Sequence, residues 1–188
     1  HPHWSLSTLF KGIPEPKNFR NGSKNRFDRN ASRAGANWEF LDALREKWKG
    51  NLIVKGIMDT DDASRVQNAG VDAIWVSNHG GRQLDSSPPA LNVLPKIRNT
   101  VGPNMPIIFD SGVRNGEDVV KALALGANFV MLGRPIMMAL AASSKKGLND
   151  YLSLLKDEIG VVMAQLGIND LEKISGDVLY DGISKNIR

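Results

Sequence analysis

Cysteine is absent from this sequence of 188 residues, and histidine is scarce, with three copies. A chain without cysteine forms no disulfide bonds and no thiolate metal sites, which fits a reducing compartment such as the cytoplasm. His1 and His3 stand at the start of the chain, and any metal that they bind would be adventitious. We therefore expect no metal site, and His79 is the only candidate for a histidine that acts as a general base.

The sequence also lacks any apolar run long enough to span a bilayer. Any membrane contact is therefore expected to be peripheral, and we expect a cytoplasmic protein. The net charge of +4 is modest, and a scattered excess of basic residues is usually a solvated surface. Because no motif of interleaved aromatic and basic residues accompanies it, nucleic-acid binding is not expected.

Much of the positive charge falls in residues 11–33, together with Pro14, Pro16 and Gly22. Polar segments of this length that contain proline and glycine are typical of long flexible loops. We therefore expect residues 1–36 to form a basic flexible loop region and residues 37–188 to form the folded domain.

Four apolar runs recur along the folded region, each followed by a polar or glycine-rich turn and then by a helical pattern. The runs cover residues 52–57, 73–77, 106–110 and 128–133. Helices are predicted over residues 61–69, 90–99, 117–125, 135–142 and 149–166, with Gly70, Gly126 and Gly167 as C-terminal caps. Continuous apolar runs are typical of strands that are covered on both faces. The alternation predicts an α/β fold with four parallel strands and flanking helices.

Side chains that could bind or react follow each of these strands. They are Lys55, Ser77 with His79, Asp110 with Arg114, and Gly133 with Arg134. Ligands of parallel α/β folds bind at the carboxyl ends of the strands. One lysine or one polar turn at such a place is usually structural, but four such features on a single rim favour a functional site.

The loop after the second strand contains His79, Gly80, Gly81 and Arg82. The glycines permit backbone angles and close ligand approach that other residues resist. If the loop curls into a helical turn, His79 and Arg82 face the same way and place a proton acceptor beside a carboxylate clamp. That pair suits an acidic substrate that loses a proton. The alternative is a polar turn in which His79 caps the backbone and Arg82 lies in solvent.

The last two strand ends have the composition of a phosphate site. Residues 110–116 supply glycine backbone, Arg114 and a helix start, and residues 133–135 supply Arg134 at a second helix start. Guanidinium groups and helix N-termini both favour bound phosphate. In (β/α)8 barrels the loops after strands 7 and 8 frequently form such a site.

The chain resembles a known family, the FMN-dependent L-2-hydroxy acid dehydrogenases and oxidases. The resemblance rests on the segments Lys55–Gly56, Ser77–Asp85, Asp110–Arg114 and Gly133–Pro135. The opening His-Pro-His-Trp and the helix between Trp38 and Trp48 look most like the bacterial L-lactate dehydrogenase branch. The resemblance runs over nearly the whole chain and is weakest from Leu6 to Ala36. It implies a TIM barrel, FMN as cofactor, and oxidation of a short L-2-hydroxy acid, with L-lactate expected, to the 2-oxo acid.

The resemblance implies a role for each matching residue. His79 would remove a proton from the hydroxy acid while an electron pair passes to FMN, and Arg82 would hold the substrate carboxylate. Lys55 would stabilise negative charge at the N1 and O2 edge of the reduced flavin, and Ser77 would also contact the flavin. The ribityl chain and phosphate would be held by Asp110, Gly112, Arg114, Gly133 and Arg134. Ser111 stands where many members of the family have glycine, and it is small enough for the turn.

The chain is too short for the whole of such a fold. A TIM barrel takes roughly 250 residues and eight strands, whereas this sequence has four strand candidates and matches the C-terminal half of the family. The start at His1 rather than methionine favours an incomplete or processed chain. A half barrel exposes two strand edges and an apolar inner face. We therefore expect it to associate with the missing N-terminal half or with itself.

Two functions stay open. The chain is either the catalytic half of an FMN oxidoreductase or a non-catalytic half barrel that lacks turnover on its own. A phosphate-binding barrel of other chemistry, such as an isomerase, is disfavoured by the string His79–Asp85. By analogy with the family, the region of residues 1–36 would cover the active site or touch the inner face of the cell membrane, with quinone or oxygen as the electron acceptor.

Overall fold

The computed structural model describes residues 2–12 and 36–180, and the chain divides into two units, residues 1–40 and 41–188. The expected flexible loop over residues 11–33 lies almost entirely outside the described residues. At its start the region of residues 1–36 differs from the expectation, because residues 2–11 form helix α1 (Pro2–Lys11). Pro2 occupies the first helical position, where its missing N–H costs no hydrogen bond, and no further proline or glycine interrupts the helix.

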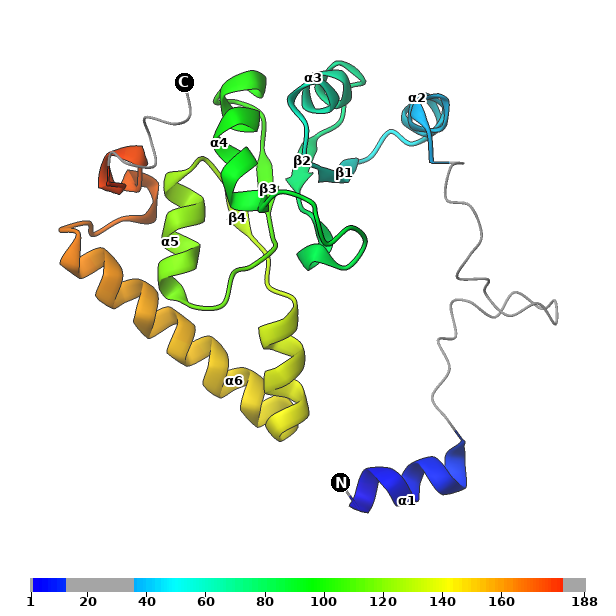
Figure 1. Cartoon of the computed structure of the whole chain (residues 1–188), viewed down its shortest axis with the longest axis vertical. Coiled ribbons are helices and arrows are strands. Elements are labelled where there is room, and N and C mark those ends of the chain that lie inside the picture. Colours follow the sequence, from blue (N-terminus) through cyan, green and yellow to red (C-terminus); the bar gives the residue numbers. More distant parts are fainter. Residues whose placement is uncertain (1, 13–35, 181–188) are drawn as a thin grey trace. The chain divides into compact units, whose positions relative to one another are not determined.

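The larger unit is built around a parallel sheet of four strands (Figure 1). The strands lie side by side in chain order, as β1 (Ile53–Ile57), β2 (Ala73–Val76), β3 (Ile107–Phe109) and β4 (Phe129–Val130). The other elements are α2 (Trp38–Lys47), α3 (Thr60–Asn68), α4 (Ala90–Val101), α5 (Gly116–Ala124), α6 (Arg134–Gln165) and the short 3-10 turns η2 (His79–Gly81), η3 (Leu171–Lys173) and η4 (Gly176–Val178). The predicted order of strands and helices is confirmed.

Local sequence signals explain where the helices begin and end. The Asp59 carboxylate accepts hydrogen bonds from the Asp61 and Asp62 amides at the start of α3. Gly70, Gly126 and Gly167 follow α3, α5 and α6 with φ of 75°, 104° and 71°. Glycine reaches these left-handed angles without steric cost. The three predicted C-terminal caps are therefore present.

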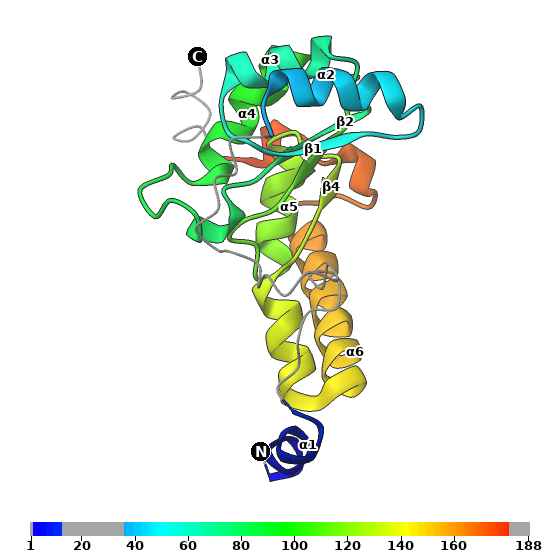
Figure 2. The same cartoon turned by 90° about the vertical axis from the view of Figure 1, so that its right-hand side faces the viewer.

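Helix α6 is two helices joined by a sharp turn, which Figure 2 shows at the end of the larger unit away from α3. The break lies at Ser143 and Ser144, whose φ values are −154° and 47°. It separates the predicted helices over residues 135–142 and 149–166. After the turn Gly147 approaches the Ala139 carbonyl so closely that a Cβ atom at position 147 would collide with it. The two arms are therefore held together by a contact that requires glycine.

The main core lies between the sheet and the helices that cover one of its faces. Alternate residues of β2 and β3 point toward this layer and are fully buried, among them Ile74, Val76, Ile107 and Phe109. They pack with buried residues of α3 and α4, which include Ala63, Val66, Leu94 and Ile97. The face of the sheet that α3 and α4 cover therefore forms a buried hydrophobic core.

The other face of the sheet is exposed in places where a buried strand was expected. Lys55, Trp75, Ile108 and Phe129 stand in register across the four strands on this face. Phe129 is 59% exposed and Ile53, also on an edge strand, is 45% exposed. The expectation from the apolar runs, that strands are covered on both faces, is therefore wrong for β1 and β4, whereas the expectation that a half barrel exposes its inner apolar face is met. Four strands form an open sheet, whose inner face has no facing strands among the described residues to cover it.

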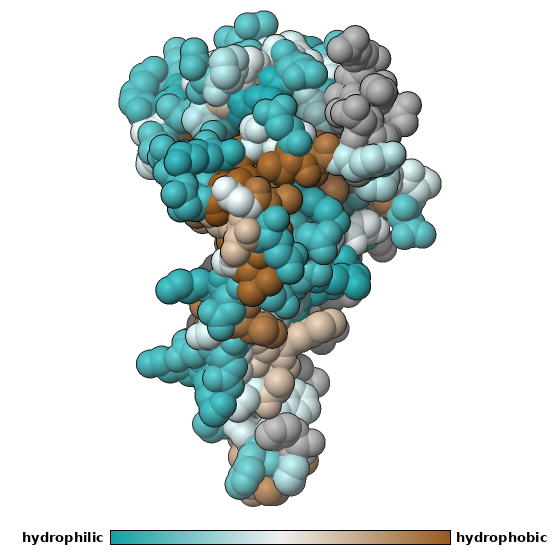
Figure 3. Space-filling view, turned by 90° about the vertical axis from the view of Figure 1, so that its left-hand side faces the viewer, coloured by the Kyte–Doolittle hydropathy of each residue, from teal (hydrophilic) through white to brown (hydrophobic). Residues whose placement is uncertain are grey.

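Apolar side chains are also exposed outside the sheet. Figure 3 shows apolar surface gathered across the middle of one face of the molecule. The second arm of α6 and the segment after it contribute exposed residues to the surface, namely Leu152, Leu154, Val161, Leu166 and Leu171. Exposed apolar area on this scale is typical of a surface that another protein element covers.

Arg98 on α4 joins two loops, those that lead into β3 and β4, at the end of the sheet opposite to the loop that contains His79. Its guanidinium donates to the carbonyls of Gly126, Gly102 and Met105 at 2.9, 2.6 and 2.8 Å, and to Asn128 Oδ1 at 2.6 Å. The Asn128 oxygen also accepts from the Ile107 amide at the start of β3. One side chain thereby fixes the entrances to β3 and β4.

We predict that Arg98→Met lowers the free energy of unfolding by about 3 kcal/mol, since several charged hydrogen bonds are lost and their carbonyl partners are left without a donor. Urea unfolding followed by circular dichroism measures the change. Lys96→Met on the exposed face of the same helix is the matched control and should alter the free energy little. Equal destabilisation by the two substitutions would contradict the assignment.

Candidate active site

The carboxyl ends of the first three strands are joined by Lys55. Its Nζ donates to Ser77 Oγ at 2.6 Å and to Asp110 Oδ2 at 2.7 Å. It also lies 4.4 Å from the centre of the Trp75 ring, a cation–π contact. Gly56 follows with φ of 98°, and the pairing register between β1 and β2 shifts there. The bulge interrupts the regular pairing directly after the lysine, and the pairing resumes between Ile57 and Val76.

Asp110 is the carboxylate at the centre of this group. Burial opposes its charge, but hydrogen bonds from Lys55, Ser77 and Ser111 outweigh that effect and hold the pKa of Asp110 below its ordinary value. The Ser111 hydroxyl donates to Asp110 Oδ1 at 2.8 Å, so both carboxylate oxygens have donors. Asp110 therefore stays ionised and compensates the charge of Lys55 at neutral pH.

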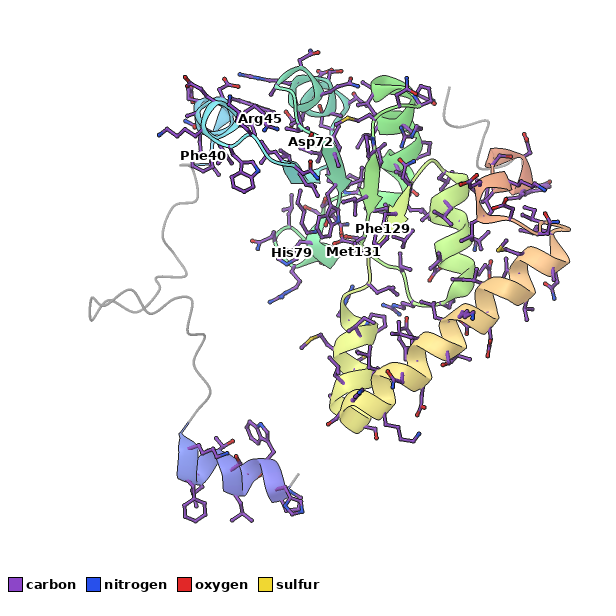
Figure 4. All side chains as sticks on the ribbon, turned by 180° about the vertical axis from the view of Figure 1, so that it is seen from behind. Phe40, Arg45, Asp72, His79, Phe129 and Met131 are labelled. Carbon is purple, nitrogen blue, oxygen red and sulfur yellow. The ribbon has the colours of Figure 1, made fainter. Side chains whose placement is uncertain are left out.

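The loop after β2 has an unusual backbone conformation. His79, Gly80 and Gly81 have φ of 56°, 66° and 77°, so three successive residues lie in the left-handed region. The expected turn is present as η2, in which the Gly81 amide donates to the Asn78 carbonyl at 3.1 Å. Two glycines in the turn reduce the steric cost of this conformation. Figure 4 shows where His79 lies in the molecule relative to the labelled Phe129 and Met131.

Five of the predicted charged residues line one cavity of about 890 Å³, namely His79, Arg82, Asp110, Arg114 and Arg134. Gly112 and Gly133 line it as well. Lys55 and Ser77 stand behind it, bonded to each other, and Lys55 is also bonded to Asp110. The strand ends therefore bring most of the predicted site residues to one cavity, which Lys55 and Ser77 do not line. Arg82 is exposed, as the alternative of a solvated arginine expected, and it also lines this cavity.

The cavity has an excess of positive charge. Among the described residues, no carboxylate forms a salt bridge with Arg82, Arg114 or Arg134. Gly112 has φ of 93°, and a Cβ at position 112 or 133 would meet open space. Guanidinium groups without a carboxylate partner, beside accessible backbone, form an environment that favours an anion such as phosphate.

The helix start after Arg114 contributes less to an anion site than the sequence suggested. The Gly116 amide donates to Glu158 Oε2 of α6 at 2.8 Å, and the Asp118 amide donates to Asn115 Oδ1 at 2.9 Å. The Arg114 amide likewise donates to Asp118 Oδ2. Because these donors are already used, the guanidiniums and the open glycine backbone are the groups left to bind an anion here.

Sequence reasoning missed two neighbours of the predicted residues. Gln83 Nε2 lies 3.4 Å from His79 Nδ1, a contact that the spacing of four residues within one turn could have suggested. Tyr151 on α6 donates its hydroxyl to the Arg114 carbonyl at 3.0 Å. Burial, with Glu158 and Asp118 nearby, raises the pKa of Tyr151, so this hydroxyl keeps its proton. No local pattern connects Tyr151 with Arg114.

Fold and site together define a class of protein, half of a parallel β/α barrel whose strand ends carry a cavity lined by three arginines and a histidine. The family described as FMN-dependent dehydrogenase matches residues 1–181, and the chain belongs to that family. The resemblance seen in the motifs is thereby confirmed.

Similar proteins include (S)-mandelate dehydrogenase of Pseudomonas putida, with 40% identity over 187 residues that cover 96% of this chain and 47% of that protein. L-lactate dehydrogenase of Caulobacter sp. (strain K31) is 46% identical over 142 residues, which cover 76% of this chain and 37% of that protein. A crystal structure of the monotopic membrane protein (S)-mandelate dehydrogenase superposes with a TM-score of 0.85 at 39% identity, covering 96% of this chain and 49% of that one.

The chain spans about half the length of the curated relatives that it matches. Its structural neighbours are FMN-dependent TIM-barrel enzymes, and the four parallel strands correspond to the C-terminal half of such a barrel. The predicted fold class is therefore confirmed.

Proposed function

We propose that this chain supplies the phosphate side of the FMN site and the catalytic base of an enzyme that oxidises a short L-2-hydroxy acid, with L-lactate as the expected substrate, to the 2-oxo acid. The observation that carries the proposal is the single cavity that contains His79 and Arg82 together with Arg114 and Arg134. A base beside a carboxylate clamp suits the substrate, and the second arginine pair suits a phosphate.

The residues at the strand ends fit FMN. The two guanidiniums and the backbone at Gly112 and Gly133 would hold the phosphate, and Asp110 would accept from the ribityl hydroxyls. Lys55 and Ser77 would face the ring system. When bound, FMN supplies the acceptor for the electron pair of the substrate. Lys55 would stabilise the negative charge that follows, at an end of the sheet where its own charge is balanced by Asp110.

The proton of the hydroxy acid would go to His79. In the structure Gln83 Nε2 faces Nδ1, a contact in which Nδ1 accepts. The role of base needs the Gln83 amide turned by 180°, an assignment that the hydrogen-bond network decides, so that the amide oxygen accepts from Nδ1–H. Nε2 then carries the lone pair that accepts the substrate hydroxyl proton. Arg82 would bind the carboxylate with two parallel hydrogen bonds and hold the reacting carbon near the base.

The exposed inner face supports a second possibility, that the chain has no turnover alone. Phe129 and Ile53 leave apolar surface on both edge strands of the described sheet. We propose that the N-terminal half of the barrel covers this face, with self-association as the alternative. In that case the 188-residue chain is a non-catalytic half barrel until it is completed.

A peripheral membrane contact is proposed for α1. Leu6, Leu9 and Phe10 share one face of this helix, and Leu9 and Phe10 are 79% and 82% exposed. Residues 11–33, which follow, are rich in lysine and arginine, and a basic segment beside an apolar helix face suits anionic lipid. No described helix is long and apolar enough to cross a bilayer. We propose contact with the inner face of the cell membrane, and quinone or oxygen as the electron acceptor.

The phosphate assignment predicts that FMN affinity depends on the arginines more than on the histidine. Arg134→Ala and Arg114→Ala should each weaken FMN binding by about tenfold to a hundredfold, because a charge-assisted contact to phosphate is lost. His79→Gln is the control and should retain FMN. Flavin fluorescence in the enzyme completed with its N-terminal half gives the dissociation constants. Wild-type affinity in Arg134→Ala would remove the assignment.

The base and clamp assignments predict different kinetic effects in the completed enzyme. His79→Gln should slow flavin reduction by L-lactate roughly 10²–10⁴-fold, because general base catalysis is lost. Arg82→Lys should mainly raise KM, since a point charge replaces a bidentate clamp. Anaerobic stopped-flow absorbance measures both. The uncompleted chain should show little or no reduction, and rapid bleaching of its flavin would contradict this expectation.

The membrane proposal predicts that Leu9→Asp weakens binding to vesicles that contain phosphatidylserine, because a charge enters the apolar face of α1. Thr8→Asp adds the same charge on the other side of the helix and is the matched control. Co-sedimentation at low and high salt measures binding, and the basic residues should make it weaker at high salt. Equal loss in the two variants would count against the apolar face.

A further inference from the structure

Ser111 has a backbone conformation that glycine would adopt more easily. Its φ is 89°, and among the described residues positive φ occurs outside glycine only at His79, Ser111 and Ser144. A side chain in the left-handed region adds steric strain. A serine at this position therefore has a steric cost that a contribution from its hydroxyl group would offset.

The Ser111 hydroxyl uses its full hydrogen-bonding capacity. It donates to Asp110 Oδ1 at 2.8 Å and accepts from the amides of Asn78 and Gly80, each at 3.2 Å. A hydroxyl has one proton and two lone pairs, so no capacity is left over. These contacts connect the β3–α5 loop to the residues directly before and after His79.

A second serine, Ser77, binds the backbone amide of His79, which lies between the amides of Asn78 and Gly80. Ser77 Oγ accepts from the His79 amide at 3.1 Å and from Lys55 Nζ at 2.6 Å. The Lys55 contact to Asp110 closes a ring of hydrogen bonds that leads back to Ser111. Three successive amides, those of residues 78, 79 and 80, are thus bound by two side-chain hydroxyls from neighbouring strand ends.

We propose that Ser111 is a positioning residue for His79. Its hydroxyl fixes the left-handed turn that places the imidazole at the cavity. Ser111 lies in the β3–α5 loop, to which we assign the binding of FMN. The inference rests on the proposed role of His79 as the base. It differs from a role as a small spacer in the turn, because a spacer would need no hydroxyl.

The test separates the hydroxyl from the backbone conformation. Ser111→Gly removes the hydroxyl and suits the positive φ, while Ser111→Ala removes it and retains the Cβ. Ser144→Gly is the matched control, since Ser144 also has positive φ but lies in the α6 turn. Amide exchange by NMR in the 188-residue chain and stopped-flow kinetics of the completed enzyme are measured for all three.

Both Ser111 variants should accelerate exchange of the Asn78 and Gly80 amides about tenfold relative to the Val120 amide in α5, because a hydrogen bond to each is lost. They should lower kcat with little change in KM or in bound FMN. Ser144→Gly should do neither. Unchanged loop exchange, or an acceleration no greater than that of Val120, would overturn the proposal.

Faster exchange in the His79 loop together with a normal kcat in the Ser111 variants would also overturn the proposal, provided that His79→Gln is inactive. If His79→Gln is fully active, the proposed base is wrong, and the exchange result still decides whether Ser111 holds the loop. The two failures are therefore distinguishable.

Discussion

The ion pair between Lys55 and Asp110 is the contact on which the arrangement of the site depends. It joins the ends of β1 and β3, which are not neighbours in the sheet, by passing the end of β2 at Ser77. A pair that is partly shielded from water interacts more strongly than one on an open surface, and loss of one partner leaves the other uncompensated. Because Asp110 also binds Ser111, the conformation of the His79 loop depends on all three strand ends.

The strand ends could be predicted from sequence because the information is local. An apolar run predicts a buried strand, the residue after it predicts the rim, and parallel connections place every rim residue on the same edge. This reasoning brought His79, Arg82, Arg114 and Arg134 together before any coordinates, and they line one cavity. Gly70, Gly126 and Gly167 were likewise predictable, since a helix end commonly needs a left-handed residue.

Contacts between distant residues could not be predicted in this way. Glu158 binds the Gly116 amide across 42 positions of sequence, and Tyr151 binds the Arg114 carbonyl across 37. The contact with Glu158 occupies the Gly116 amide at the start of α5. The sequence predicts that this helix start helps to bind phosphate, and that part of the prediction is therefore weakened. The exposure of Phe129 follows from the length of the chain, which leaves the inner face of a half barrel open, and not from the apolar pattern of its strand, which is the same whether or not a facing strand covers it.

The two faces of the sheet differ in how much of their apolar surface is covered. Phe109, Ile74 and their helix partners form a layer that is buried within this half of the barrel, while Phe129 on the opposite face is 59% exposed. Local contacts of this kind form early in folding, whereas contacts across a whole barrel close the longest loops. It follows that the strands and helices of this chain can form from their own contacts before the open face is covered. The open face is then a preformed surface, and an element that covers it docks onto a finished sheet.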